Sequence, residues 1–502
     1  MDRSKRVVGV GIVALMLMVA AACGQKPGVA LQGLSGALPE GTEIIDGQVV
    51  DTETGEVIGS VEEILGGSGD LGDLASGDTT TSGGTTTGGT TSGGTTGGGT
   101  GGGTGGGTGG GSAPTEGDTT GISNDTIKIG IHAPLTGAAP VPSDSVQIGK
   151  DLYFRWMADK GQSVFGRNFE VILRNDQYNP STAVSVCKEM VEKDKVFLLS
   201  GAAGTDQIQA CARYAYSVGV PYLGAGVTET VLNNLPNYFA TTMTYNDQGP
   251  LLADFIVSKL GAKGEKNGML TFETPNFEDA RQGFRDGMRQ QGASLDYERT
   301  VSKGAGPSEA RTVVQEMSTR GIENVFVLTS PVWWLDVLKQ ADTQQFRPQW
   351  VGVGISMTFD DVSRVGCSAP RVGAPGDPNA SMNRAKFFAP FPAWADSNRF
   401  DPEFRQAVSK FHPTESGGDD FMLLSWSGSK TIWEMFKRIG PNPTRELFVY
   451  EVERMRGVKN GLGPILNFAP DDHFGASQVH VSEVNCATDS RWHTIHSFVS
   501  DF

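Results

Sequence analysis

One segment, 79–112, consists only of Gly, Thr and Ser and holds about a quarter of the chain's 68 glycines. Such a segment has no large apolar side chains to bury, so folding cannot offset the entropy lost on ordering it. The segment therefore separates a short N-terminal part from a long body, 125–502. We expect residues 66–120 to form a disordered Gly/Thr-rich tether, and residues 41–65 to form at most a small hairpin or a short helix.

The N-terminal segment 1–22 predicts export. Arg3, Lys5 and Arg6 give it a positive start, and every residue from 7 to 22 is apolar or Gly. A membrane-spanning helix needs about 20 apolar residues, so this run is too short to span and fits the apolar region of a signal peptide. We therefore assign residues 1–22 to a signal peptide.

Small residues precede Cys23, an arrangement similar to a bacterial lipobox, although Ala20 stands where Leu is usual. We predict that Cys23 becomes lipidated at the mature N-terminus and that residues 23–124 connect this anchor to the body. The alternative is an ordinary cleavage site with an incidental cysteine. The expected location is the outer face of the cell membrane, reached through the lipid alone.

Four cysteines remain in the exported part, an even number in an oxidising compartment. Three pairings are possible. We favour Cys187–Cys211, which should lie on successive helices of one layer, and Cys367–Cys486, which would tie a loop to the C-terminal segment. None of them forms a CxxC motif, which argues against a zinc ribbon or a thioredoxin-like site. We predict no metal site and no cofactor.

The formal net charge of −16 argues against nucleic-acid binding, because phosphate contacts need clustered Lys and Arg. Acidity of this kind keeps an exported protein soluble.

From residue 125 the chain alternates strands and helices. In the first half we predict strands at 126–132, 169–174, 196–199 and 220–223, separated by helices at 145–160, from 180, and at 205–217. This rhythm is typical of βαβ units with a parallel sheet.

The alternation of strands and helices then begins again in the second half of the body. We predict strands at 268–272, 297–301, 324–328 and 350–352, and helices at 277–290, 308–320 and 332–341. Two such runs indicate two α/β lobes. Ligands of open α/β sheets bind beyond the carboxyl ends of the strands, so two facing lobes would share one crevice.

Several segments in this order carry a family resemblance: IKIGIHAPLTG (127–137), NDQYNPSTAVSVCKEMV (175–191), VGVPYLGAGVTET (218–230), TFETPNFEDARQGFRDGM (271–288) and NGLGPILNF (460–468). The body resembles a type I periplasmic binding protein of the branched-chain amino acid (Leu/Ile/Val) type, which serves ABC transporters. The resemblance covers about 125–490.

The resemblance implies two Rossmann-like parallel-sheet lobes joined by three crossovers. We place the crossovers and lobes as follows: crossovers near 243–248, 374–388 and 461–469; lobe 1 at about 125–245 and 385–462; lobe 2 at about 246–375 and 468–502. It also implies that a small molecule, an amino acid or a related amide or carboxylate, is captured between the lobes and delivered to an ABC permease without chemical change.

Thr205 follows a Gly-rich turn at the start of a predicted helix. A helix N-terminus exposes free N–H groups and a positive dipole end, so this turn is a candidate carboxylate cradle; the alternative is a helix cap without a ligand. By resemblance, the carbonyl of Gly226 and the hydroxyl of Thr228 would bind the ligand's ammonium and carboxylate.

Two aromatic positions complete the expected site. Phe277 stands where the family has an aromatic wall. Trp333 and Trp334 are adjacent, so we expect one of them to leave the core, and we assign Trp333 to the ligand.

Residues 351–356 depart from the family, which places near here a carboxylate that pairs with the ligand's ammonium. Gly354 or a neighbour stands there instead. Either Glu229 or Glu273 replaces the acid from another direction, or the ligand is not an α-amino acid.

Enzyme motifs are missing from the sequence: it contains no HExxH, no P-loop and no GxSxG, and its six histidines are scattered. We therefore predict a binding protein and not an enzyme. A receptor of the same fold that senses a ligand and signals through a membrane partner is the alternative; a hydrolase with an unrecognised site is a distant third.

Overall fold

The computed structural model describes residues 113–502, except 138–139, 202, 227, 275–276, 369–379 and 415–419, together with three strands nearer the N-terminus. The predicted signal peptide, the lipidation site Cys23 and the tether up to residue 112 lie outside the described residues. Among the helices that are described, none is both long and apolar enough to cross a membrane.

The N-terminal strands form a small antiparallel sheet of their own. They are β1 (Thr42–Ile45), β2 (Gln48–Asp51) and β3 (Val57–Ser60), in the order β1-β2-β3. For 41–65 we expected at most a small hairpin or a short helix; the structure has β1 and β2 paired as a hairpin, with β3 as a third strand. They belong to a compact unit distinct from the body.

The body starts before residue 125. Arg445 forms an ion pair with Asp118, and its guanidinium also donates to the carbonyls of Val196 and Phe197. The backbone N–H of Asp118 donates to Glu446 at 2.8 Å. The predicted tether 66–120 is therefore too long at its C-terminal end, because residues 117–120 are held against the body.

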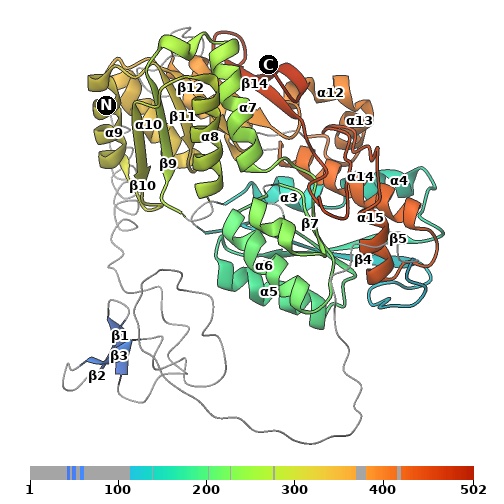
Figure 1. Cartoon of the computed structure of the whole chain (residues 1–502). Coiled ribbons are helices and arrows are strands. Elements are labelled where there is room, and N and C mark those ends of the chain that lie inside the picture. The colour runs from blue at the N-terminus through green and yellow to red at the C-terminus, as the bar shows by residue number, and fades with distance from the viewer. Residues whose placement is uncertain are drawn as a thin grey trace, which may run out of the picture. The chain divides into compact units, whose positions relative to one another are not determined.

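The first lobe is built on a parallel sheet in the order β5-β4-β6-β7-β8. Its strands are β4 (Thr126–Ala133), β5 (Asn168–Asn175), β6 (Leu198–Gly201), β7 (Tyr222–Gly224) and β8 (Tyr238–Ala240). Helices α5 (Pro180–Glu192) and α6 (Thr205–Ser217) pack on one another, as Figure 1 shows. A second group comprises α3 (Ser143–Gly149), α4 (Leu152–Asp159), α13 (Pro402–Phe411), α14 (Phe421–Ile439) and α15 (Arg445–Val452).

The second lobe has a sheet in the order β10-β9-β11-β12-β13-β14-β15 (Figure 1). Five parallel strands come first: β9 (Asn267–Phe272), β10 (Tyr297–Val301), β11 (Asn324–Leu328), β12 (Gln349–Val353) and β13 (Ala385–Ala389). Two antiparallel strands, β14 (Val479–Asn485) and β15 (Arg491–Val499), extend it. Its helices include α7 (Tyr245–Ser258), α8 (Glu278–Gln291), α9 (Pro307–Arg320), α10 (Pro331–Thr343) and α11 (Asp360–Ser368).

The fold prediction is confirmed, but one boundary is wrong. β13 pairs in parallel with β12, so residues 385–389 belong to the second sheet and not to lobe 1. Its sequence, AKFFA, is a buried strand and not a crossover. The described chain passes between the lobes within 241–244, after 389, and within 453–478.

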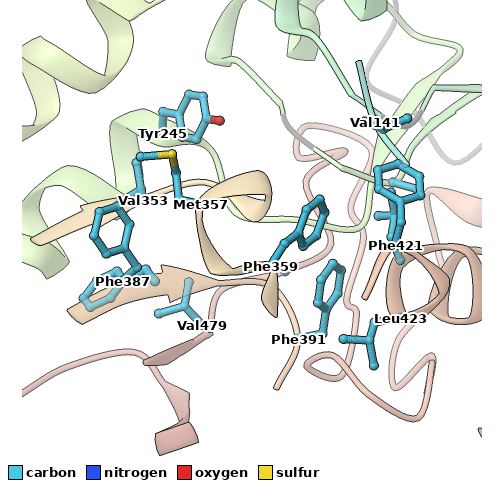
Figure 2. Packing of buried hydrophobic residues seen from close by; sticks show 14 of the residues in the cluster. Val141, Tyr245, Val353, Met357, Phe359, Phe387, Phe391, Phe421, Leu423 and Val479 are labelled. Carbon is cyan, nitrogen blue, oxygen red and sulfur yellow. The ribbon is translucent and has the colours of Figure 1, made fainter. Parts of the chain in front are cut away.

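Aromatic packing joins the lobes beside these crossovers. The rings of Phe359 and Phe421 lie 5.9 Å apart, one from each lobe, and Figure 2 shows Phe391 from the second passage close by. The backbone N–H of Asp360, at the start of α11, donates to Asp420 just before α14 at 3.0 Å. Burial, and then the neighbouring Asp360, hold the pKa of Asp420 well above its usual range.

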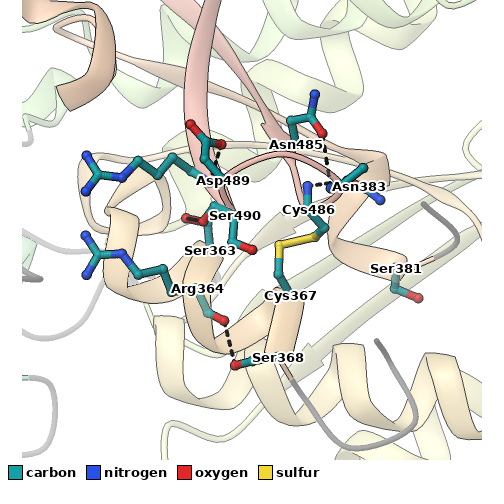
Figure 3. Close-up of a disulfide and its surroundings, with 12 residues drawn as sticks. Ser363, Arg364, Cys367, Ser368, Ser381, Asn383, Asn485, Cys486, Asp489 and Ser490 are labelled. Atoms are coloured by element: carbon teal, nitrogen blue, oxygen red, sulfur yellow. Dashed lines mark hydrogen bonds between the residues drawn. A yellow bond between two sulfur atoms is a disulfide. The ribbon is translucent and has the colours of Figure 1, made fainter. Parts of the chain in front are cut away.

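Both predicted disulfides are confirmed. Cys187 on α5 is bonded to Cys211 on α6. Cys367 is bonded to Cys486 (Figure 3); it lies on helix α11 and not in a loop as expected. The backbone N–H of Cys486 also donates to Asn383 at 2.7 Å, so the end of β14 is held from two sides.

The two disulfides should differ in their contribution to stability. The Cys187–Cys211 bond closes a sequence separation of 24 and the Cys367–Cys486 bond one of 119. Chain-entropy reasoning gives about 3 to 4 kcal/mol for the shorter loop and about 5 kcal/mol for the longer one. Urea unfolding of the two double Cys→Ala variants should therefore show the larger loss for Cys367/Cys486. The opposite order would mean that native packing, and not loop closure, dominates.

Candidate functional site

A cavity of about 310 Å³ lies between the two lobes. The first lobe lines it with Pro140, Val141, Pro142, Tyr178, Ala203, Gly204 and Thr205. The second lobe lines it with Tyr245, Phe277, Leu328, Thr329, Ser330, Pro331, Val332, Leu335, Val353, Gly354, Met357, Phe359, Asp361, Val362 and Val365. Many of these residues follow the carboxyl ends of β6, β11 and β12, where ligands of parallel sheets bind. We call this cavity the cleft.

The N-terminus of α6 opens into the cleft. Gly204 precedes it with φ +85°, a conformation that favours glycine, and a Cβ at this position would lie 2.2 Å from Gln207 Oε1. The N-cap residue of α6, Gly204, has no side chain that could cap the helix, so the first N–H groups of α6 can bind a ligand. Thr205, the first residue of the helix, lines the cleft and adds a hydroxyl. This turn can bind a carboxylate.

A second helix N-terminus reaches the cleft from the other lobe. Ser330 caps α10 by accepting from the N–H of Trp333 at 3.3 Å, and Pro331 and Val332 begin the helix. The positive ends of two helix dipoles therefore meet the same cavity. Together they favour a negative group on the ligand and disfavour a positive one.

Charged side chains are nearly absent from the cleft wall. Asp361 is the one acid among the described lining residues, and no Lys, Arg or His is among them. Gly354 occupies the place where the family resemblance implies a carboxylate; its φ of +114° favours glycine. A ligand ammonium would lose water here without gaining a charge partner at this position.

Aromatic and aliphatic groups form the rest of the wall. Tyr245 and Phe277 pack edge to face, with ring centroids 6.1 Å apart. Figure 2 shows Met357 beside Val353 and near Tyr245. Such a wall offers contact area to an apolar ligand body.

A buried hydrogen-bonded chain supports Tyr178. His132 Nδ1 lies 2.7 Å from Asp176 and its Nε2 lies 2.7 Å from Tyr222 Oη. Asp176 accepts from the backbone N–H of Tyr178 at 2.9 Å, which helps to hold Tyr178 at its positive φ of 55°. Burial, followed by Asp206 and Asp176, raises the pKa of Tyr178 to about 12.

The lobes also meet at the edge of the cleft. Lys303 of the second lobe forms an ion pair with Asp206 on α6 and lies 5.9 Å from the centre of the Tyr178 ring. The N–H of Thr230 donates to Asp279 on α8 at 2.8 Å. These contacts hold the two lobes together across the cleft.

The predicted site residues fall into two groups. Thr205 and Phe277 line the cleft. Gly226 and Thr228 are not among the described lining residues, and the Thr228 hydroxyl lies 2.9 Å from Tyr238 Oη in a buried pair. Their role as ligand contacts stays a prediction.

The prediction that one of the two tryptophans leaves the core is wrong, because both are buried. Trp333 packs on Phe272 with ring centroids 5.7 Å apart and donates to the carbonyl of Gly306 at 3.3 Å. Trp334 packs on Phe387 at 4.9 Å. Helix α10 is covered on two sides, so neighbouring positions are both enclosed, and Trp333 is not among the described cleft residues.

Two acids are candidates for replacing the missing carboxylate. Glu273 is exposed and does not line the cleft. Glu229 is buried behind Thr205, with 3% of its surface exposed, and accepts from Gln209 at 3.3 Å. Burial, then Asp279 and Asp206, raise the pKa of Glu229 to about 8, while a hydrogen bond with Thr205 opposes the rise.

Sequence reasoning missed Tyr178, Tyr245 and the Pro140–Pro142 segment. Tyr178 comes shortly after the second predicted strand, so the rule that ligands bind beyond strand ends could have found it. Tyr245 and the proline segment carry no such pattern. His132 also lies near Cys187 and Cys211, but both thiols are used in the disulfide and offer no thiolate to a metal.

The comparisons with known proteins agree with this geometry. A family model described as periplasmic binding protein matches residues 126–490. No curated protein matches the chain in sequence.

Similar solved structures share the fold. One is a fatty acid ABC transporter substrate-binding protein from Thermomonospora curvata (18% identity, TM-score 0.65, covering 76% of this chain and 95% of that one). Another is an ABC transporter solute binding protein from R. palustris in complex with 4-hydroxybenzoate (17%, TM-score 0.60, 75% and 98%). A third is the branched-chain amino acid transporter substrate binding protein LivJ from Streptococcus pneumoniae in complex with isoleucine (16%, TM-score 0.61, 74% and 99%).

The raised pKa of Glu229 predicts a pH-dependent stability. The folded state holds the proton up to about pH 8, whereas the unfolded chain releases it near the ordinary value of 4.5. The free energy of unfolding should therefore fall as pH rises through this window, by roughly 4 kcal/mol at most. Urea unfolding at pH 5 and pH 8 should show this fall in the wild type and a smaller one in Glu229→Gln. Glu170→Gln, on β5, should behave as wild type. Identical pH dependence in all three proteins would contradict the assignment.

Proposed function

The chain belongs to the periplasmic binding protein family, and from this premise we propose that it is an extracytoplasmic solute-binding lipoprotein whose ligand is a small apolar carboxylic acid. The ligand is captured between the lobes and delivered to an ABC permease. The observation that carries this proposal is the cleft: two helix N-termini meet in it, and Gly354 stands where the family resemblance implies an ammonium-binding acid.

The electrostatics of the cleft favour an acid without an amine. A carboxylate would accept from the free N–H groups of α6 and from the Thr205 hydroxyl, next to a positive dipole end. The ammonium of an α-amino acid would face the same positive ends, with Asp361 as the one charged side chain among the described lining residues. An unpaired charge of this kind is costly to take out of water.

The names of two of the three similar proteins support this ligand class. A fatty acid and 4-hydroxybenzoate each combine an apolar body with one carboxylate and no amine. The isoleucine of a third protein carries an ammonium as well. The apolar wall and the cavity of about 310 Å³ suit the first two ligands better than the third.

A matched pair of ligands tests the proposal. Leucine and 4-methylpentanoate differ only in the ammonium group, so their relative affinity measures what the cleft does with that charge. We expect calorimetry on the purified protein to show at least tenfold tighter binding of 4-methylpentanoate, about 1.4 kcal/mol or more. Benzoate and octanoate should also bind. Tighter binding of leucine would overturn the proposed ligand class.

The lipid anchor has its own test. Cys23→Ser removes the thiol that would carry the lipid, so the protein should move from the membrane fraction to the soluble exported fraction. Labelling with a fatty-acid analogue should be lost in the same variant, while Cys367→Ser, which lies in the body, should keep it. Membrane retention of Cys23→Ser would show that the anchor is not this lipid.

A further inference from the structure

Two valines that line the cleft are exposed to solvent. Val332 is 67% exposed and Val365 is 47% exposed, and Val332 is the most exposed large apolar side chain in the described part of the chain. Leu328 and Met357 of the same wall are nearly fully buried. The cleft therefore has a closed floor and opens to solvent at the two valines.

The two valines lie on neighbouring helices of the second lobe. Val332 is in the first turn of α10, Val365 is in the second half of α11, and the two helices pack on one another. On each helix a second apolar residue of the cleft wall stands three positions away, Leu335 on α10 and Val362 on α11. Residues three apart lie on one face of a helix, so each helix presents an apolar stripe to the cleft. We call these four residues the slot.

The slot leads from covered to exposed side chains. Val362 is buried and Leu335 is partly buried against the core, whereas Val365 and Val332 face solvent. Both stripes therefore continue the apolar wall of the cleft outward, beyond the part that the two lobes enclose.

Charged side chains do not interrupt the slot. Asp361 is the one charged residue among the described lining residues, and Arg364 of the same helix lies 3.5 Å from it. Asp336 and Lys339 of α10 do not line the cleft and pair with one another at 3.2 Å. A ligand that lies along the slot therefore meets apolar groups.

We propose that the slot holds the tail of a long unbranched carboxylic acid, whose carboxylate lies at the N-terminus of α6 and whose tail leaves the cleft over α10 and α11. This inference rests on the proposed function, because it takes the carboxylate position from it. It narrows the ligand class from small apolar acids to acids with a long alkyl chain.

The chemistry of the slot favours an alkyl tail over a polar one. A polar tail would lose water over the valines without gaining a hydrogen-bond partner. An alkyl tail gains affinity with every methylene that it covers, about threefold to fourfold each. Because the slot is continuous with the cleft, one ligand can occupy both.

The experiment is the affinity of the purified protein for hexanoate, octanoate, decanoate and dodecanoate, each below the concentration at which it forms micelles. Wild type should gain about threefold to fourfold per methylene through dodecanoate. The double variant Val332→Asn/Val365→Asn should lose at least tenfold for dodecanoate and progressively less for each shorter acid. Both valines are exposed, so the substitutions remove little core packing. Val218→Asn, at a valine that is 41% exposed and does not line the cleft, should follow wild type at every length.

The outcomes separate the possible failures. A wild-type affinity that stops rising after octanoate overturns the slot and leaves the proposed function standing. A double variant that loses nothing, or loses equally for all four acids, also overturns the slot, because the valines then serve another partner such as the permease or shape the cleft as a whole. If neither these acids nor 4-methylpentanoate and benzoate bind wild type, the proposed function fails and the slot fails with it.

A labelled ligand tests the same proposal without any variant. Dodecanoate with a fluorescent group on its last carbon should bind wild type, and iodide in solution should quench the bound label, because the end of the tail lies outside the cleft. Hexanoate with the same label should bind at least tenfold more weakly, because its label would meet the closed floor. Binding of dodecanoate but not of labelled dodecanoate would mean that the cleft encloses the whole tail, and would overturn the slot.

Discussion

The parallel direction of the strands determines where this molecule can bind a ligand. In a parallel sheet each strand is followed by a helix that starts at the same sheet edge, so the helix N-termini gather there. In the first lobe this edge brings α6 to the cleft, and in the second lobe it brings α10. The site is therefore built from backbone N–H groups and dipoles before any side chain is considered.

The specificity of the cleft then comes from the charged groups that its walls lack. The cleft has apolar and aromatic sides, one acid and no base among its described lining residues. A positive φ at Gly354 excludes most side chains from the position where the family resemblance implies an ammonium partner. The buried hydrogen-bonded chain of His132, Asp176 and Tyr222 holds Tyr178 at the opposite wall. The polar side chains of this chain therefore lie behind the cleft wall and support it from there.

Much of the fold could be predicted because strands buried on both faces appear in the sequence as apolar runs. Strands such as β9 and β11 belong to this class. β14 carries His480, Ser482 and Glu483 among its apolar residues, and β8 is very short, so neither has a clear pattern. β13 is hard to recognise as a strand of the second sheet because helix α11 and a further segment separate it in the chain from its partner β12.

The candidate site could be predicted where it follows a strand end, as for Thr205 and Phe277. It could not be predicted where it depends on what packs around a helix, as for Trp333. Glu229 was named as a candidate acid, but its raised pKa depends on its burial and on Asp279 of α8 in the other lobe, which no local pattern reveals.

Helix α11 forms part of the cleft wall through Asp361, Val362 and Val365, and its last turn carries Cys367. The bond to Cys486 therefore ties this wall to the turn that follows strand β14 of the second sheet. Such a bond persists where thiols are oxidised and is rare where they are kept reduced. A newly made chain in a reducing compartment would hold this wall by noncovalent packing alone, so the rigidity of the cleft depends on where in the cell the chain resides.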